Sequence, residues 1–322
     1  MGGWLVIFVA LLLIAIRGTG ALVASMRFLV ISDVIDSESY YGYDRWMAQT
    51  MQAFFAVIVT SYFQKRNERK NSLWNVIIPL IVCLLSCTVV FGNNRMMMIY
   101  FGLSAMSILS VSFPKYKKGV FLIVIAAMAV VLVSFTLIKQ YRVDITQESA
   151  EIENEGLAGS LAVYVSSTEA IAKAYDRYQL TGNQMQAMTI FADIVDKTPI
   201  MHLPGLPFIT AVKGITPSYS LAMTSHEVVP AAGQTLYYGG YTFGWLLDII
   251  AFWLVMLLMV KLEIHSKLEI NLGNRYLYTW TSVVCGLVMC YHFGIIWNAF
   301  AYVPFFLLVA LTINRKLVIK KS

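Results

Sequence analysis

Two arginines at the ends of apolar runs are the strongest candidates for chemistry in this sequence. Arg95 ends the Gly92-Asn93-Asn94-Arg95 turn between two apolar runs, and Arg142 follows the end of another apolar run. A guanidinium group binds phosphate oxygens through two parallel hydrogen bonds and stays charged at any working pH. The pair therefore suits a lipid-linked diphosphate, although arginines at helix ends also anchor helices by reaching to the interface.

A second candidate group follows further along the chain. His226 and Glu227 are the best candidates for a general base, because a transferase that activates a sugar hydroxyl needs a base with a pKa near ambient pH. The alternative is that they form a solvated pair in a loop. Tyr237, Tyr238 and Tyr241 offer flat apolar rings for sugar faces, or else belong to an interfacial aromatic belt.

The composition defines the class of protein that must position these groups. The 322 residues are 58% hydrophobic and 13% charged, with a mean hydropathy of +0.68, whereas a soluble domain is about 45–50% apolar and about 25% charged. Runs of about 18 uncharged apolar residues recur, and they predict an all-α, polytopic integral membrane protein. An ordinary cytosolic enzyme, a disordered chain and a disulfide-stapled secreted scaffold are excluded.

Seven segments are apolar and long enough to cross a bilayer: 46–63, 73–91, 96–113, 119–138, 242–260, 277–293 and 297–313. Two shorter runs at the N-terminus, 4–16 and 21–31, form either one broken helix or two short crossings. The sequence therefore predicts eight or nine spans. The four cysteines all fall in apolar segments, which indicates small buried side chains. No metal-ligand spacing is present, and neither a metal nor a cofactor is predicted.

The distribution of charge predicts the orientation. Fourteen of the 24 Lys and Arg residues lie near 65–70, 115–118, 261–275 and 315–321, on connections that alternate to the same side. The positive-inside rule places that side, with the C-terminus, in the cytoplasm. The 97-residue segment 139–235, which has 6 basic and 10 acidic residues, is then extracytoplasmic. The predicted organisation is thus N-terminal helices (1–138), a large external loop (139–235) and C-terminal helices with a basic tail (236–322).

The loop itself carries two predicted helices. Segment 157–180 is amphipathic, with a face formed by Tyr164, Thr168, Ile171, Tyr175 and Tyr178 that we expect to pack, and segment 184–195 forms the second. A loop of this length is usually functional. It returns to the next span through Gly239, Gly240 and Gly244, which allow a kink or a close approach of helices. Asp248 follows as an intramembrane acid, either functional or paired with Arg17 or Arg27.

The order of these features resembles the Wzy-type polymerases of O-antigen and capsule repeat units. The similarity covers residues 74–306 and is carried by the Gly92–Arg95 turn, the external arginine, the long loop and the Tyr241-Thr242-Phe243-Gly244-Trp245 segment. The resemblance implies a glycosyltransferase of the bacterial inner membrane that polymerises undecaprenyl-diphosphate-linked oligosaccharides. It implies that Arg95 and Arg142 hold the lipid diphosphate, and it makes a chain-length regulator a plausible partner.

Three other functions fit the sequence, and one of them is a non-catalytic assembly protein whose loop binds a partner. A ligase that transfers the glycan to lipid A has a related layout, and sequence separates it poorly from a polymerase. A transporter or flippase of lipid-linked sugars belongs to a different class; the large loop and the absence of a detectable internal repeat argue against it, while Asp248 with the N-terminal arginines argues mildly for it.

Overall fold

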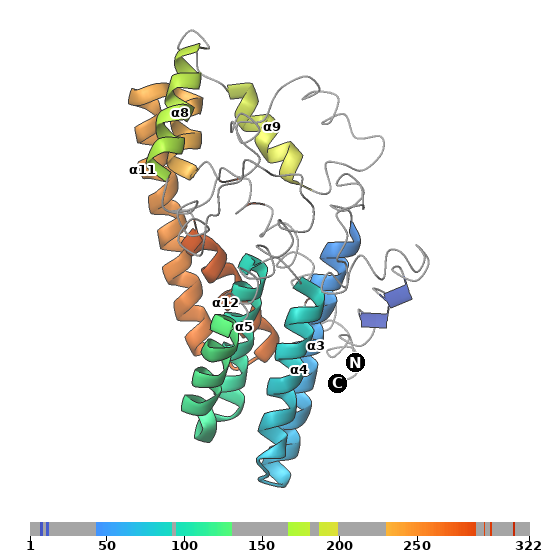
Figure 1. Ribbon diagram of the computed structural model, residues 1–322. Helices are drawn as coiled ribbons and strands as arrows, with labels where there is room; N and C mark the ends of the chain where they lie inside the picture. Colours follow the sequence, from blue (N-terminus) through green and yellow to red (C-terminus); the bar gives the residue numbers. More distant parts are fainter. Residues whose placement is uncertain are drawn as a thin grey trace. The chain divides into compact units, whose positions relative to one another are not determined.

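The structure is a computed structural model that describes residues 43–91, 95–130, 167–180, 187–198 and 230–287, with the single residues 7, 8, 11, 12, 293, 297 and 312. Within these ranges the regular structure is helical and contains no strand (Figure 1), which confirms the all-α prediction for the described part of the chain. The predicted N-terminal crossings and the 297–313 span lie almost wholly outside it.

The chain divides into two compact units, and each contains segments distant in sequence. Unit 1 comprises Met1–Phe135, Leu262–Thr281 and Tyr302–Ser322, and unit 2 comprises Thr136–Lys261 and Ser282–Ala301. The predicted loop 139–235 falls within unit 2.

Unit 1 contains a set of helices, and the two turns between them that the structure describes carry basic residues. The helical elements are α3 (Tyr43–Arg69), α4 (Trp74–Phe91), α5 (Arg95–Ser112), the 3-10 turn η2 (Pro114–Tyr116) and a helical stretch at 117–130. Four of the predicted spans thus begin or lie in these helices. α3 continues past its apolar part, because Arg66 and Arg69 in its last turn interact favourably with the negative end of the helix dipole.

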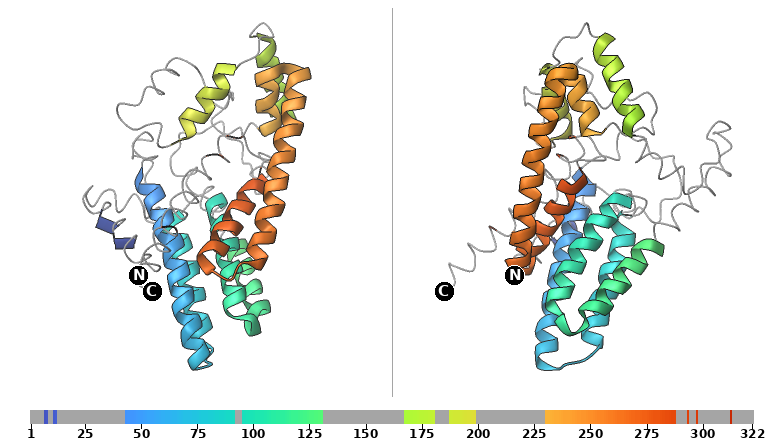
Figure 2. Two further views of the ribbon diagram at one scale, coloured as in Figure 1. Left: turned by 180° about the vertical axis from the view of Figure 1, so that it is seen from behind. Right: turned by 90° about the vertical axis from the view of Figure 1, so that its left-hand side faces the viewer.

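α3 and α4 are joined by a side-chain hydrogen bond, in which the Gln52 amide donates to Ser86 Oγ at 3.3 Å. Ala53 and Ala56 of α3 are completely buried, and such small side chains allow helix backbones to approach closely. The turn between the helices is fixed by its own polar groups: Asn67 accepts from the backbone N–H of Ser72 at 3.3 Å, and the Asn75 amide donates to the Lys70 carbonyl at 2.7 Å. Figure 2 shows this hairpin and α5 from two further directions.

The first part of α12 (Leu272–Gly286) adds an aromatic core to unit 1. Trp280 and Tyr276 are completely buried. The ring of Trp280 meets Tyr100 of α5 edge-on at 5.5 Å between centroids and lies nearly parallel to Tyr276 at 6.0 Å. Such aromatic pairs contribute about 0.5–1.5 kcal/mol beyond the apolar area they bury. The core of unit 1 therefore combines these aromatic rings with completely buried aliphatic side chains such as Ile108 and Leu109.

One described helix, α11 (Ala231–Leu268), is long and apolar enough to cross a membrane. The segments Trp74–Ser86 and Ile99–Ser112 are apolar but shorter. The prediction of eight or nine spans is therefore neither confirmed nor contradicted by the described residues. The two cysteines that the structure describes, Cys83 and Cys285, are buried and unpaired, as the sequence predicted for them.

Candidate functional site

The glycine-rich start of α11 forms a sharp elbow. Gly240 has φ 67° and ψ −166°, a backbone region essentially restricted to glycine. The chain folds back so tightly that a Cβ added at Gly244 would lie 2.7 Å from the Cα of Leu236. The short arm before Gly240 therefore packs backbone to backbone against the long arm after it. This confirms the kink and close approach predicted from the three glycines.

α8 (Ser167–Leu180) packs directly against this elbow. The ring of Tyr178 occupies the space where a Cβ of Gly240 would be, and Tyr175 meets the ring of Tyr241 edge-on at 6.2 Å between centroids. Tyr175 and Tyr178 are also stacked, at 6.4 Å. The predicted packing of the tyrosine face is confirmed for these two residues, while Tyr164 lies outside the described residues.

α9 (Ala187–Lys197) contributes a buried carboxylate that sequence reasoning missed. Asp193 is 3% exposed, and its Oδ2 accepts hydrogen bonds from the Gln234 amide at 2.7 Å and from the Tyr238 hydroxyl. Its neighbours on the buried face of the helix are Thr189 and Ala192. Because a buried carboxylate is costly unless it is hydrogen-bonded, these contacts explain why Asp193 is tolerated there.

Gln234 connects this carboxylate to a third segment of unit 2. Its Nε2 donates to Asp193 and, at 2.6 Å, to the Tyr238 hydroxyl, while its Oε1 accepts from the backbone N–H of Phe293 at 2.8 Å. A second hydrogen bond joins the residue after α9 to a distant part of the sequence, since the Trp297 indole donates to Thr198 Oγ1 at 2.6 Å. Phe293 and Trp297 are thus hydrogen-bonded to the short arm and to the end of α9, from which they are distant in sequence.

The predicted sugar-binding tyrosines separate into two kinds of environment. Tyr237 and Tyr238 are buried, at 8% and 6% exposure, and the phenol of Tyr237 lies within electrostatic reach of Asp193 and of Arg177 on α8. Tyr241 is 66% exposed and contacts Trp245 edge-on at 6.3 Å. Of the three rings, that of Tyr241 is open to a ligand in this structure.

The other predicted groups are described only in part. Arg95 is the first residue of α5, but its side chain is not among those the structure describes. Arg142, His226 and Glu227 lie outside the described residues. The intramembrane candidate Asp248 is half-buried on the long arm and interacts with the Thr235 hydroxyl of the short arm, which gives it a polar neighbour other than Arg17 or Arg27.

Among the residues described, no group of three or more His, Cys, Asp or Glu side chains is arranged to hold a metal ion. The chemistry that the elbow region can perform is that of hydrogen bonding and ring contact. A buried carboxylate orients an amide and a phenol, and the exposed ring of Tyr241 lies two turns before Asp248 on the long arm.

Comparison with protein-family models, with curated proteins and with solved structures found no match for this chain.

Proposed function

We propose that this protein is a polytopic membrane glycosyltransferase that polymerises undecaprenyl-diphosphate-linked oligosaccharide repeat units into O-antigen or capsular polysaccharide. It acts at the outer face of the bacterial inner membrane, with its C-terminus in the cytoplasm and segment 139–235 outside. Its partners are the lipid-linked glycan, the bilayer and a chain-length regulator protein.

In the proposed reaction, the growing glycan on undecaprenyl diphosphate is the donor, and a sugar hydroxyl of a second lipid-linked repeat unit is the acceptor. The acceptor oxygen forms a bond to the anomeric carbon of the donor, and the bond from that carbon to the diphosphate oxygen breaks. The diphosphate leaves with the electron pair, held by Arg95 and Arg142. His226 or Glu227 takes the proton from the acceptor hydroxyl.

The apolar surface of α11 supports a membrane location. On its long arm, bulky side chains are exposed at 40–64%, and they include Phe243, Ile249, Trp253 and Leu257. The stretch 117–130 exposes a similar face with Phe121, Leu122 and Ile125. Soluble proteins rarely expose such continuous apolar faces, because water makes them unfavourable, whereas lipid chains can cover them.

The placement of basic residues supports the proposed orientation. Lys65, Arg66, Arg69 and Lys70 at the α3–α4 turn are exposed, as are Lys115, Lys117 and Lys118 around η2. Figures 1 and 2 place these two turns at the same end of unit 1. A shared basic end is what the positive-inside rule requires of two cytoplasmic turns.

The observation that carries the proposal is the elbow. Two helices from the acidic segment 139–235 contact the start of the one described helix that is apolar and long enough to span a bilayer: α8 contacts the elbow, and α9 contacts the short arm. A transferase that acts on a lipid headgroup needs extramembrane residues held at the point where a span begins. The exposed ring of Tyr241 lies at that point and suits contact with a sugar face.

A deletion strain tests the reaction class. With the gene removed and surface polysaccharide separated on a gel, loss of a polymerase leaves single repeat units on the acceptor. Loss of a ligase leaves no glycan on the acceptor, and loss of a flippase leaves lipid-linked units on the inner leaflet. Either of the last two patterns contradicts the proposal.

The diphosphate clamp is tested at Arg142 with two substitutions. Arg142→Ala should abolish long polymer, and Arg142→Lys should restore little of it, because an ammonium group lacks the planar fork of the guanidinium. Arg69→Ala, at an exposed turn, is the matched control and should leave polymer unchanged. Full-length polymer from both Arg142 variants, at normal protein levels, would remove the clamp from the mechanism.

A further inference from the structure

We propose that Asp193 is a positioning residue for the glycan site, acting through Gln234 and Tyr238 on the elbow that carries Tyr241. This inference rests on the proposed function and names the group that sets the geometry of its sugar-binding surface.

The first argument is the direction of the hydrogen bonds. The Asp193 carboxylate can only accept, and the backbone N–H of Phe293 can only donate. Gln234 lies between them, so its amide must turn its Nε2 to Asp193 and its Oε1 to Phe293, as observed at 2.7 and 2.8 Å. The Tyr238 hydroxyl completes the set, since it accepts from Gln234 and donates to Asp193. One arrangement therefore satisfies every group.

The second argument is burial. Asp193, Gln234 and Tyr238 are at most 6% exposed. The same face of α9 already carries the small buried side chains Ala192 and Val195, which would suffice for apolar packing. A buried carboxylate opposes folding by its desolvation, so its presence is better explained by the orientation it imposes than by a gain in stability.

The third argument is the short path from Asp193 to the exposed ring. Tyr238 is followed by Gly239 and Gly240, and Tyr241 is the first residue beyond the elbow. The backbone of the short arm touches the long arm at Gly244, so a rotation of the short arm would move the elbow. Tyr175 then meets the Tyr241 ring from the side. The carboxylate thus fixes the direction from which Tyr241 meets a sugar.

The test exchanges donors and acceptors. Gln234→Glu keeps the shape and can still accept from the Phe293 N–H, but it sets a carboxylate oxygen against the Asp193 carboxylate, which can only accept. Adding Asp193→Asn restores the pattern with its direction reversed, because the introduced amide N–H₂ can donate to the introduced carboxylate. Asp176→Asn on α8 is the matched control, since Asp176 is exposed.

The measurement uses the purified full-length protein in lipid, with lipid-linked repeat units as substrate and the folded fraction determined by size-exclusion chromatography. We expect Gln234→Glu to raise KM for the repeat unit about tenfold, the double variant to return KM to within about threefold of the original, and Asp176→Asn to leave it unchanged. A purely structural role would lower kcat in proportion to the folded fraction and leave KM alone.

Two results would overturn the inference, and they are distinct from failure of the proposed function. An unchanged KM for Gln234→Glu, or no recovery in the double variant, rejects Asp193 as a positioning residue while the polymerase assignment stands. An original protein that makes no polymer from lipid-linked units rejects the polymerase assignment, and the positioning role with it.

Discussion

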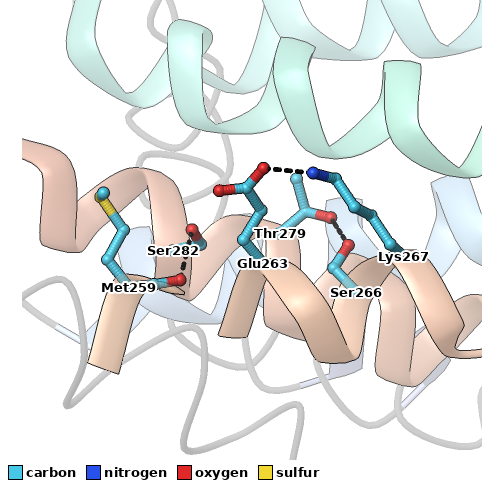
Figure 3. Close-up of polar contacts among 6 residues, drawn as sticks. All are labelled: Met259, Glu263, Ser266, Lys267, Thr279 and Ser282. Carbon is cyan, nitrogen blue, oxygen red and sulfur yellow. Dashed lines mark hydrogen bonds and ion pairs between the residues drawn. The ribbon is translucent and has the colours of Figure 1, made fainter. Parts of the chain in front are cut away.

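The two ends of α11 carry charge in opposite ways. At the elbow, the carboxylate of Asp193 is buried and bonded to an amide and a phenol. At the other end, Glu263 and Lys267 form an ion pair of 2.6 Å whose side chains are 52% and 69% exposed (Figure 3). The single carboxylate at the elbow is thus shielded from solvent, whereas the ion pair at the other end is screened by water.

The difference teaches which end is sensitive to substitution. An exposed pair four residues apart on a helix contributes about 0.3–0.5 kcal/mol. Removal of one partner from a buried hydrogen-bonded group costs about 1–3 kcal/mol, because the group that remains is left without water or a partner. Substitutions at the elbow should therefore have large effects and those at the exposed pair small ones.

The largest effect is expected for Gly240→Ala. A side chain at φ 67° and ψ −166° costs about 1–3 kcal/mol in backbone strain, and the added methyl would also overlap the Tyr178 ring. We expect a loss of at least 2–3 kcal/mol on that basis, measured by thermal unfolding of the purified protein in detergent. Gly119→Ala, where an added Cβ meets nothing within 4 Å, is the control and should not destabilise. Equal stability of the two variants would contradict the claim that the backbone conformation at Gly240 requires glycine.

The second-largest effect is expected for Gly244→Ala, which should lower the free energy of unfolding by about 1–3 kcal/mol through overpacking. The added methyl would meet backbone atoms of Thr235 and Leu236 at 2.7 Å, and backbone cannot rotate away as a side chain can. The same unfolding measurement applies. A loss much larger than that of Gly240→Ala would reverse the order predicted from the backbone conformation.

The sequence predicted the elbow but not the carboxylate beside it. The glycines at 239, 240 and 244 indicate a bend from their type alone, because no other residue adopts the required conformation cheaply. Asp193 gave no such signal. In α9 the apolar Met188 and Ile194 are 54% and 44% exposed while Thr189 and Asp193 are buried, which is the reverse of what hydropathy predicts. The rotation of α9 is decided by its partners Gln234 and Tyr238, more than 40 residues away, and a single sequence does not reveal that pairing.

The positions of α4 and α5 were predicted well, whereas α11 begins at Ala231 and ends at Leu268, well outside the predicted span 242–260. The bounds of α4 and α5 follow from apolar runs that end at polar or basic turns, which is local information. α9 begins at Ala187 and ends at Lys197, two to three residues later than the predicted 184–195. The aromatic core of Tyr100, Tyr276 and Trp280 was not predicted, because it joins helices about 180 residues apart.

At the opposite end of α11, Arg275→Met should have an intermediate effect of about 1 kcal/mol. The guanidinium donates to Ser107 Oγ at 3.1 Å and to the carbonyls of Lys267 and Glu269 at 3.3 and 3.4 Å, where the helix ends. Burial lowers the pKa of Arg275 from its ordinary value. Because the ordinary pKa of arginine is very high, the group stays protonated between pH 5 and pH 9. The stability loss of Arg275→Met should therefore not vary over that range. Arg69→Met, at an exposed position, is the control for unfolding in detergent at several pH values.

The smallest effect is expected for Glu263→Gln, at most about 0.5 kcal/mol and smaller still in high salt. The neighbouring contacts, Ser266 with Thr279 at 2.6 Å and Ser282 with the Met259 carbonyl at 3.3 Å, do not involve it (Figure 3). A loss comparable to that of Gly240→Ala would contradict the contrast between the two ends.

The central claim is that the α8–α9 region and the basic turn between α3 and α4 face opposite sides of a membrane. Single cysteines in place of the exposed residues Asp176 and Asn71 test it, with an impermeant thiol reagent applied to intact cells and the unsubstituted protein as background. We predict that Asp176→Cys is labelled in intact cells, and that Asn71→Cys is labelled only after permeabilisation. Labelling of both from the same side, or in the reverse order, would contradict the proposed topology and the polymerase that depends on it.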